Sequence, residues 1–496
     1  MNRERAETFL RLLAEKVLRE AAAGPPVSLG AWSADSPAPG FPRLGRVAQA
    51  LTAVHALDVA TAQDILADFA IAVGVRQHSD QGLLLLAHSG YASGMRARAW
   101  SWAAGGRGWP AGRGRAALTS GPSRPGPGPS RTGPDRFLPL GVTASFRDGD
   151  VSGELILLSY VHTGAGARFT VTWRTSGADN PARPGRATPG PGFPMVFTVK
   201  DDKGASYRLE FRFTGGPDWA GEMRVLPDPP ERVRWLEFSA PGEPAVRISL
   251  EDGDEGTSGP AGQAGRSTGE HLLNAVADRM LVIAAEYPQD LRLRLAATAQ
   301  GPLSGVASGL GDVVAALEAA EVLSPLSTLP GQLVSLCASL RVGGHGLAAP
   351  PADLPERWLS VLAHYQRRRP HTAPARDGHA AVAAAFPGLD GVRLALLGLH
   401  NTDGETRANL LLSGLAEDES WLPGLESVPL SVWVRDGIGR WHVGSVAGSD
   451  YADGEYLLRM KLVPPLARST AWIEVVAAWR SAEVSATVPL RWGFPP

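Results

Sequence analysis

Two stretches of the sequence share one pattern: Phe197-Thr198-Val199-Lys200-Asp201-Asp202-Lys203-Gly204 and Val432-Trp433-Val434-Arg435-Asp436-Gly437-Ile438-Gly439. In both, apolar residues alternate with others and then give way to an Asp/Gly turn. Alternation with a period of two indicates a strand, and a turn signal directly after it indicates a hairpin. We therefore expect two β-hairpins of the same construction, one in each half of the chain.

Three further landmarks follow each hairpin in the same order. They pair Ala220-Gly221-Glu222-Met223 with Asp453-Gly454-Glu455-Tyr456, Pro229-Pro230 with Pro464-Pro465, and Trp235-Leu236-Glu237-Phe238 with Trp472-Ile473-Glu474-Val475. Chance rarely places four landmarks in one order at separations of 233 to 237 residues. The sequence therefore predicts that one structural unit is used twice.

The expected helices repeat as well. Leu44-Gly45-Arg46-Val47 matches Leu310-Gly311-Asp312-Val313, and the stripe Phe9, Leu13 and Val17 matches Val276, Met280 and Ala284. Apolar residues at these spacings lie on one face of an amphipathic helix. Because the helical offset of 266 exceeds that of the β landmarks, the first unit contains about 30 extra residues.

The resulting fold class is α+β and multidomain: a tandem duplication of a helical module followed by an antiparallel, Ig-like β-sandwich. Each β segment has about seven short runs rich in β-forming residues, with turns between them and no long helices, which is typical of a sandwich of about 100 residues. Neither has the Cys-Trp-Cys pattern of a true immunoglobulin domain. The expected parts are helical module 1 (3–90), a disordered linker (91–135), β-sandwich 1 (136–250), helical module 2 (270–369) and β-sandwich 2 (390–496).

Composition sets the broad class of protein. Hydrophobic residues make up 44% of the 496 residues and charged residues 20%, values that exclude wholesale disorder. Only four of the 48 basic residues are lysines, a bias typical of a GC-rich genome and hence of a bacterium. The single cysteine, Cys337, cannot form an intramolecular disulfide, the N-terminus is too charged for a secretory signal, and no apolar run reaches the length of a membrane span. These features predict a cytoplasmic protein.

No motif supports a catalytic, cofactor or metal site. Ser89 and Ser308 lack the glycine spacing of a nucleophile elbow, and the glycine cluster at 305–311 lacks the lysine of a phosphate-binding loop. The eleven histidines show none of the spacings that zinc ligands need. We therefore assign no catalytic or metal residue and no cofactor from the sequence.

Recurring carboxylates and tryptophans are the next candidates. Paired carboxylates could perform acid/base chemistry, but we expect Glu222, Glu455, Glu237 and Glu474 to be exposed strand residues, because strand alternation turns them away from apolar neighbours. We expect Trp235 and Trp472 to be core aromatics, since large aromatics dominate sandwich cores.

The linker at 91–135 offers one binding hypothesis. Arginines interleaved with Trp100, Trp102 and Trp109 could neutralise phosphates and stack on bases of single-stranded nucleic acid. A basic, Gly/Pro-rich run is more often a solvated tether, which is the interpretation we prefer. The candidate nucleic-acid contacts are Arg96, Arg98, Arg107, Arg113 and Arg115.

These observations favour a non-enzymatic cytoplasmic scaffold, adaptor or regulatory protein that acts through protein-protein contacts. One alternative is an enzyme of unknown class with a site in the cleft between the two units, a place where pockets commonly form. The other is a weak nucleic-acid binder that uses the linker. A protein partner is expected, whereas a membrane is not and nucleic acid is a minor possibility.

Deleting residues 91–136 distinguishes tether from nucleic-acid contact. We expect the intact chain and the deletion to bind single-stranded and duplex oligonucleotides equally and negligibly, because a tether makes no phosphate contacts. Binding is measured at two salt concentrations. Salt-sensitive binding that disappears with the segment would instead assign the arginines to phosphate contacts, since each such contact releases counterion.

Overall fold

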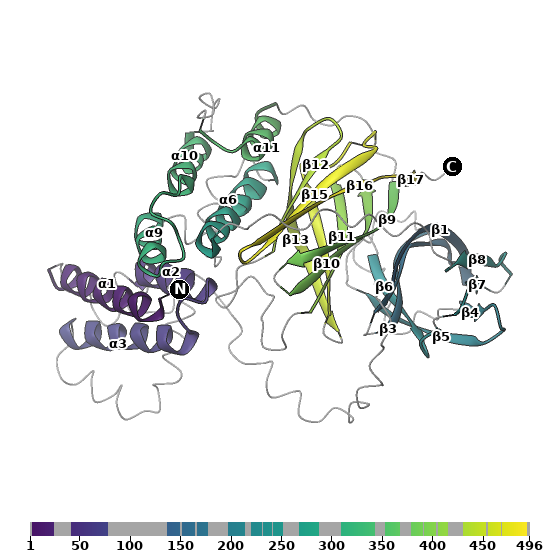
Figure 1. Cartoon of the computed structure of the whole chain (residues 1–496), viewed down its shortest axis with the longest axis horizontal. Helices are drawn as coiled ribbons and strands as arrows, with labels where there is room; N and C mark the ends of the chain where they lie inside the picture. Colours follow the sequence, from purple (N-terminus) through teal and green to yellow (C-terminus); the bar gives the residue numbers. More distant parts are fainter. Residues whose placement is uncertain are drawn as a thin grey trace.

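The computed structural model describes most of the chain, with gaps. The described residues are 2–23, 41–77, 136–148, 151–163, 166–176, 197–213, 220–230, 232–240, 242–250, 267–286, 309–342, 353–367, 378–389, 391–402, 405–414, 430–452, 455–467 and 469–493. They form an α+β protein, mostly β, with seven helices and two large antiparallel sheets. Figure 1 shows the helices at the left, the second sheet in the middle and the first sheet at the right.

The helices come from both halves of the chain. They are α1 (Arg3–Ala23), α2 (Phe41–Ala53), α3 (Val59–Gln77), α6 (Thr268–Glu286), α9 (Leu310–Ala319), α10 (Leu329–Val342) and α11 (Glu356–Arg367). Their apolar faces share one hydrophobic core, which includes the predicted stripe residues Leu13 and Val17 of α1. Among the described residues, no helix combines the length and the apolar character needed to cross a membrane.

A bidentate ion pair between Arg43 and Asp312 holds α2 against α9. The Arg43 guanidinium donates from Nε to Asp312 Oδ2 over 2.6 Å and from Nη2 to Oδ1 over 2.8 Å. This hydrogen bonding holds the pKa of the Asp312 carboxyl below its ordinary value, although partial burial opposes the effect. The contact joins one helix from each half of the chain.

The first sheet contains eight strands. They are β1 (Arg136–Asp148), β2 (Val151–Thr163), β3 (Gly166–Ser176), β4 (Thr198–Asp201), β5 (Ser206–Phe213), β6 (Ala220–Leu226), β7 (Trp235–Ser239) and β8 (Val246–Ser249). Their spatial order is β1-β2-β3-β6-β5-β4-β7-β8, and β1 also contacts β8. The sheet therefore curves around its own core, an arrangement compatible with a sandwich-like fold.

The second sheet repeats this order and adds one short strand at its edge. Its strands are β9 (Gly378–Leu389), β10 (Val392–Thr402), β11 (Glu405–Ser413), β12 (Ser431–Asp436), β13 (Trp441–Ala452), β14 (Glu455–Val463), β15 (Trp472–Trp479), β16 (Ala482–Pro489) and β17 (Trp492–Gly493). From β9 to β16 the order is β9-β10-β11-β14-β13-β12-β15-β16, which matches the first sheet position by position.

Two details differ from the sequence-based prediction. The second β segment starts at Gly378 rather than 390, because the alanine-rich stretch before Phe386 has weak strand propensity yet pairs with β10 along its length. The proline landmarks are also out of register: Val233 N donates to Pro230 O and Thr470 N to Ala467 O, so Pro230 corresponds to Ala467.

Both predicted hairpins form, and one aspartate organises each turn. In β4–β5, Asp201 Oδ1 accepts the backbone N–H groups of Lys203 (2.9 Å) and Ala205 (2.8 Å). In β12–β13, Asp436 Oδ1 accepts those of Ile438 (3.1 Å) and Arg440 (2.8 Å). An aspartate at this position closes a turn because its side chain satisfies backbone donors that no strand can reach.

In each hairpin, the Oδ2 atom of the turn aspartate faces a ring, a tyrosine in the first hairpin and a histidine in the second. Tyr207 Oη donates to Asp201 Oδ2 over 2.8 Å, whereas His442 Nε2 lies 3.5 Å from Asp436 Oδ2. Burial opposes ionisation of Asp201, but the Tyr207 hydroxyl and the backbone donors outweigh it and lower its pKa. Burial lowers the pKa of His442, opposed in part by the Pro464 carbonyl and Asp436. The two hairpins thus have the same kind of turn, but the group with the lowered pKa is Asp201 in the first and His442 in the second.

Replacing Tyr207 with phenylalanine tests the role of this hydroxyl. We expect Tyr207→Phe to lower the free energy of unfolding by about 1 to 2 kcal/mol at pH 7, because an ionised carboxylate loses a donor. Since the pKa of Asp201 is lowered in the folded state, its contribution is complete above about pH 4 and is lost as the pH falls through the folded value. The deficit should therefore shrink in acid.

Chemical denaturation at pH 7 and pH 3 measures this effect, and a double-mutant cycle with Asp201→Asn isolates the pair. A coupling energy near zero at pH 7 would contradict the assigned role of the hydroxyl.

Candidate functional site

The carboxylates Glu222 and Glu455 are buried, so the prediction that they are exposed is wrong. They are only 8% and 6% exposed. Both converge on Arg168 of β3: Arg168 Nη1 lies 3.0 Å from Glu222 Oε1, and Nη2 is paired with Glu455 Oε2. Strand alternation does turn them away from the core of their own sheet, but the other sheet covers that face.

Arg168 therefore joins the sheets. Its Nη2 also donates to Thr163 Oγ1 over 3.0 Å, so one guanidinium binds β2, β6 and β14. A planar guanidinium suits this task because its donors diverge in fixed directions. We call Arg168, Glu222 and Glu455 the Arg168 cluster. Each charge in it is paired within the protein.

A small apolar contact surrounds this cluster. Buried residues from both sheets form it, namely Val161, Ala395, Leu397, Leu411 and Leu457, with Phe137 packed against them. The sheets approach closely at Gly398 of β10, where an added Cβ would lie 3.0 Å from Leu158 Cδ1. A Cβ at position 398 would fit only if Leu158 of β2 moved by a few tenths of an ångström.

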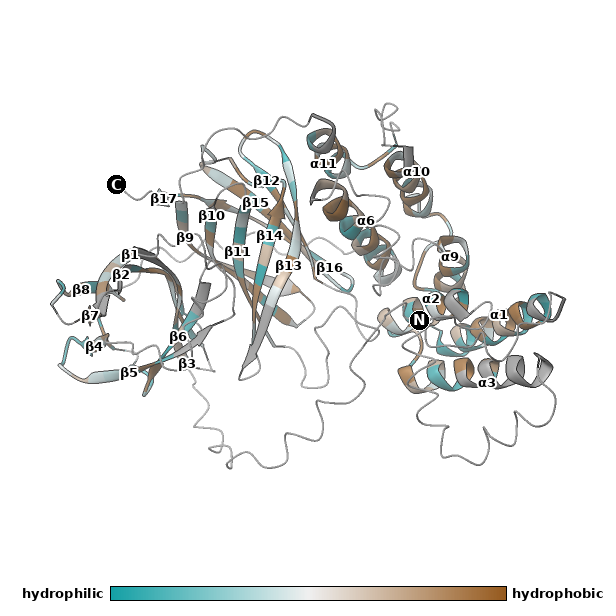
Figure 2. Cartoon of the chain, turned by 180° about the vertical axis from the view of Figure 1, so that it is seen from behind, coloured by the Kyte–Doolittle hydropathy of each residue, from teal (hydrophilic) through white to brown (hydrophobic). Residues whose placement is uncertain are grey.

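A second polar joint holds the helices to the second sheet. Asp278 of α6 is buried and accepts hydrogen bonds from Ser431 Oγ and, over 3.1 Å, from Trp433 Nε1. The Arg357 guanidinium of α11 stacks over the Trp433 ring, 5.2 Å from its centroid. Figure 2 shows α6 and α11 beside β12 and β13, with hydrophobic and hydrophilic turns alternating along α6.

Trp235 and Trp472 are outside the core, which corrects the prediction for both. Along β7 the residues alternate between half-buried Trp235 and Glu237 and buried Leu236 and Phe238. A tryptophan and a glutamate that lie two residues apart in a strand point to the same face. The tryptophan could therefore not lie in the core while the glutamate lay at the surface. In β15 the equivalent Trp472 is 39% exposed.

Trp472 lies at the centre of an exposed group of residues at one end of the second sheet. Its ring rests on the β12–β13 turn, where an added Cβ on Gly437 would lie 3.1 Å from Trp472 Nε1. The turn also presents Ile438, which is 67% exposed. We call the group the Trp472 surface; it consists of Arg435, Ile438, Arg440, Trp472 and Arg491.

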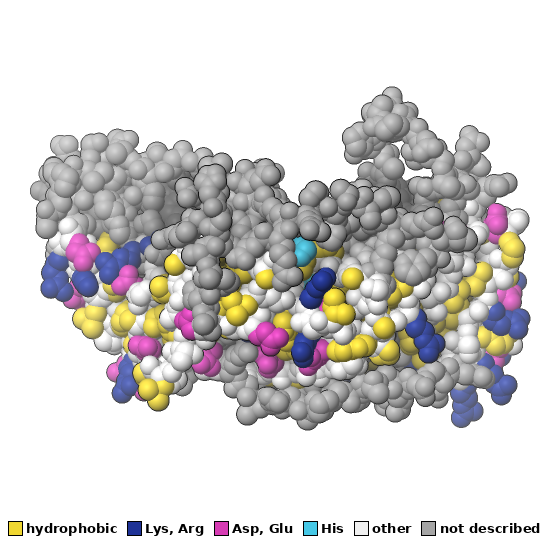
Figure 3. All heavy atoms as spheres, turned by 90° about the horizontal axis from the view of Figure 1, so that it is seen from above, with side chains coloured by type: hydrophobic (Ala, Val, Ile, Leu, Met, Phe, Trp, Pro, Cys, Tyr) yellow, Lys and Arg dark blue, Asp and Glu magenta, His cyan; other side chains and the backbone are white. Residues whose placement is uncertain are grey.

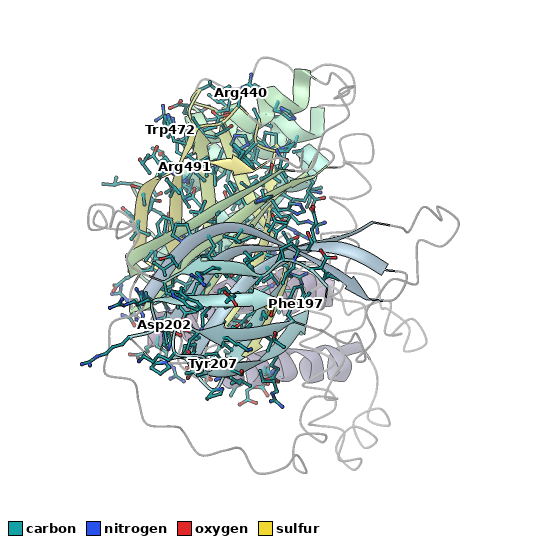
Figure 4. All side chains as sticks on the ribbon, turned by 90° about the vertical axis from the view of Figure 1, so that its right-hand side faces the viewer. Phe197, Asp202, Tyr207, Arg440, Trp472 and Arg491 are labelled. Carbon is teal, nitrogen blue, oxygen red and sulfur yellow. The ribbon has the colours of Figure 1, made fainter. Side chains whose placement is uncertain are left out.

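Arginines frame this surface. Arg435 faces Glu474 (Nη1 to Oε2, 3.8 Å) and lies 5.7 Å from the Trp441 ring centroid. Arg440 and Arg491 are exposed, and Figure 4 shows both labelled side chains at the same end of the molecule as Trp472. On the described part of the face in Figure 3, basic and acidic side chains are interspersed among hydrophobic ones. Three arginines of the Trp472 surface lie beside two acids, Glu474 and the turn residue Asp436.

The equivalent tryptophan of the first sheet is covered. Arg247 lies 4.0 Å from the Trp235 ring centroid and pairs with Glu237 over 3.2 Å. In the register of the second sheet, the position of Arg247 is taken by Thr487, which cannot stack on Trp472. Of these two tryptophans, Trp472 is the more exposed.

The three charges of the Arg168 cluster are paired with one another, and among the described residues no three His, Cys, Asp or Glu side chains gather as metal ligands would. An open tryptophan with flanking arginines is the residue set that dominates binding energy in protein interfaces. The candidate nucleic-acid residues Arg96, Arg98, Arg107, Arg113 and Arg115 lie outside the described residues.

Removing the arginine of the Arg168 cluster should destabilise the protein strongly. We expect Arg168→Met to lower the free energy of unfolding by about 3 to 5 kcal/mol, because two buried carboxylates lose their counter-charge. Adding Glu222→Gln and Glu455→Gln to this variant should restore much of the loss, since no buried charge then remains.

Denaturant unfolding measures both variants, with Arg247→Met as the control. Arg247 belongs to an exposed pair, so its removal should cost no more than about 1 kcal/mol. If Arg168→Met lowers the free energy of unfolding as little as the control does, the claim that Arg168 joins the two sheets is wrong.

The chain was also compared with known proteins. No protein-family model, no curated protein and no solved structure matches it.

Proposed function

We propose that the protein is a non-enzymatic scaffold, adaptor or regulatory protein that binds a partner protein through the Trp472 surface. The observation that carries this proposal is the contrast between two equivalent tryptophans: Arg247 covers Trp235, whereas Trp472 is open beside Ile438. An exposed aromatic and an exposed aliphatic side chain gain free energy when a partner removes them from water.

The charge of the surface indicates the chemistry of the partner. Arg435, Arg440 and Arg491 outnumber the two acids beside them, Glu474 and Asp436, by one. Complementary charge speeds association and suppresses unsuitable partners. We therefore expect an acidic segment of the partner, with an apolar side chain that packs between Ile438 and Trp472.

The rest of the molecule would act as a rigid support, in the cytoplasm, where the free Cys337 stays reduced. The Arg168 cluster joins the sheets, and Asp278 joins the second sheet to the helices. A surface presented by a rigid body loses less conformational entropy on binding than one on a flexible segment.

We further infer that the two halves arose by tandem duplication of a helical module and an Ig-like sandwich. The identical strand order and the repeated Asp turn support this inference. The same backbone geometry also follows one helix in each half, 266 residues apart. His55 and Glu321 both have positive φ, and Leu57 N donates to Leu51 O just as Leu323 N donates to Leu317 O.

Alanine at the two tryptophans tests the proposed function. Proteins bound to the tagged full chain are identified from its native cells, and the binding of each purified partner is then measured by calorimetry. We expect Trp472→Ala to weaken binding of a true partner about 30-fold, the effect of losing a central interface tryptophan of about 2 kcal/mol. The matched control Trp235→Ala should bind as the unmodified chain does.

Charge reversal gives an independent measure. The double variant Arg440→Glu/Arg491→Glu should lose affinity as well, and binding of the unmodified chain should weaken between about 50 and 300 mM salt, because exposed charges are screened. Equal affinity of all variants for every partner would exclude the Trp472 surface as the binding site.

A further inference from the structure

A buried aspartate and a buried histidine face each other in the β12–β13 hairpin without a hydrogen bond. Asp436 is 1% exposed and His442 is 2% exposed. Asp436 Oδ2 and His442 Nε2 lie 3.5 Å apart, beyond the usual length of about 2.7 to 3.2 Å, and among the described residues neither atom has a hydrogen-bond partner. The large majority of buried polar atoms have one, so this pair requires an explanation.

The other ring nitrogen of His442 fixes where its first proton lies. Nδ1 is 2.6 Å from the carbonyl oxygen of Pro464, which can only accept, so Nδ1 carries a proton and donates it. In a neutral imidazole the second nitrogen, Nε2, then has no proton. It presents a lone pair to Asp436 Oδ2, and an ionised carboxylate is also only an acceptor. One proton between the two atoms would satisfy both.

The first hairpin shows the contact that the second lacks. Asp201 Oδ2, the equivalent oxygen, accepts from Tyr207 Oη over 2.8 Å while Oδ1 of the same carboxylate closes the turn. His442 occupies the position of Tyr207, but its neutral ring offers no donor to Asp436. A proton on Nε2 would make the ring a donor. We propose that Asp436 and His442 bind one proton from solvent in mild acid, and that its uptake moves the turn beneath Trp472.

The surroundings of His442 set the pH at which the proton binds. Two charged groups act on the ring: Asp436 favours the proton and Arg440 of the turn opposes it. The facing strand positions are apolar, since Val434 of β12 lies opposite His442 and Ile473 of β15 lies opposite Asp436. Burial is the main reason that the pKa of His442 lies below its ordinary value of about 6.5. The ring is therefore mainly neutral at pH 7 and gains its second proton in acid.

Proton uptake would shorten the contact and displace the carboxylate. Imidazolium N–H bonds to carboxylates measure about 2.7 to 2.9 Å, so Nε2 and Oδ2 would approach each other by about 0.6 to 0.8 Å. Oδ1 of the same carboxylate accepts the backbone N–H groups of Ile438 over 3.1 Å and Arg440 over 2.8 Å. Between them and Asp436 lies Gly437, on which the Trp472 ring rests. The displacement therefore reaches the exposed part of the turn.

A regulatory role for this movement rests on the proposed function of the Trp472 surface, whereas proton uptake does not. Acid would change the arrangement of Ile438 and Trp472, and with it the shape that a partner meets. Two measurements on the full chain without any partner test the proposal. Their outcome is therefore independent of whether the Trp472 surface binds a protein.

Nitrogen-15 NMR of the chain labelled at histidine tests the proton site. The resonances of His442 are identified by their loss in His442→Gln and, independently, in His442→Tyr, which copies the first hairpin. Above pH 7 we expect a neutral ring with its proton on Nδ1, and below a midpoint under about pH 6.5 a ring with protons on both nitrogens. A neutral ring with its proton on Nε2, or unfolding of the chain before Nε2 gains a proton, overturns the proposal.

Fluorine NMR of the chain labelled with 5-fluorotryptophan tests the movement. The Trp472 resonance is identified by its loss in Trp472→Phe. We expect it to shift with the midpoint of the His442 titration, and this shift to be absent in His442→Gln and His442→Tyr, because neither side chain titrates in this range. The matched control His55→Asn replaces an exposed histidine and should titrate as the unmodified chain does. A Trp472 resonance that does not shift with pH, or that shifts equally in the two His442 variants, overturns the proposal.

Discussion

The pairing of Arg168 with Glu222 and Glu455 is the constraint on which the arrangement of the two sheets depends. Both carboxylates and the guanidinium are nearly fully buried, so each would pay a large desolvation penalty if its partner were absent. The pairing forms only when β14 of the second sheet lies against β3 and β6 of the first. Apolar contact alone allows sliding, whereas charges that must meet select one docking position.

The joint between the helices and the second sheet also depends on buried polar side chains that must meet their partners, although the groups are different. Asp278 accepts from Ser431 and Trp433, and Arg357 covers the other side of the indole. Both joints thus place buried polar side chains where two layers meet. The second sheet is held on two sides, which leaves the end that carries Trp472 and the Asp436 turn open.

Local sequence was a sound guide to local structure. The two alternating stretches that precede the Asp turns form β4 and β12, and both turns form, because period-two alternation and turn chemistry act over a few residues. The errors concern contacts across the chain. The sequence around Glu222 and Glu455 does not indicate that Arg168 pairs with them. No local pattern distinguishes a strand face that another sheet covers from one that water covers. Trp235 and Trp472 could have been placed correctly by noting that each shares a face with a glutamate two residues on.

The exchange of Tyr207 for His442 gives the two sheets different responses to acid. His442 has a lowered pKa in the folded protein, so unfolding takes up a proton once the pH is below the unfolded value of about 6.5. This group therefore favours folding fully above about pH 6.5 and progressively less as the pH falls toward the folded value. Tyr207 gains no proton in that range, and Asp201 responds only near pH 4 and below. Mild acid thus lowers the free energy of unfolding through His442 of the second sheet, whereas Tyr207 and Asp201 of the first sheet leave it unchanged in that range.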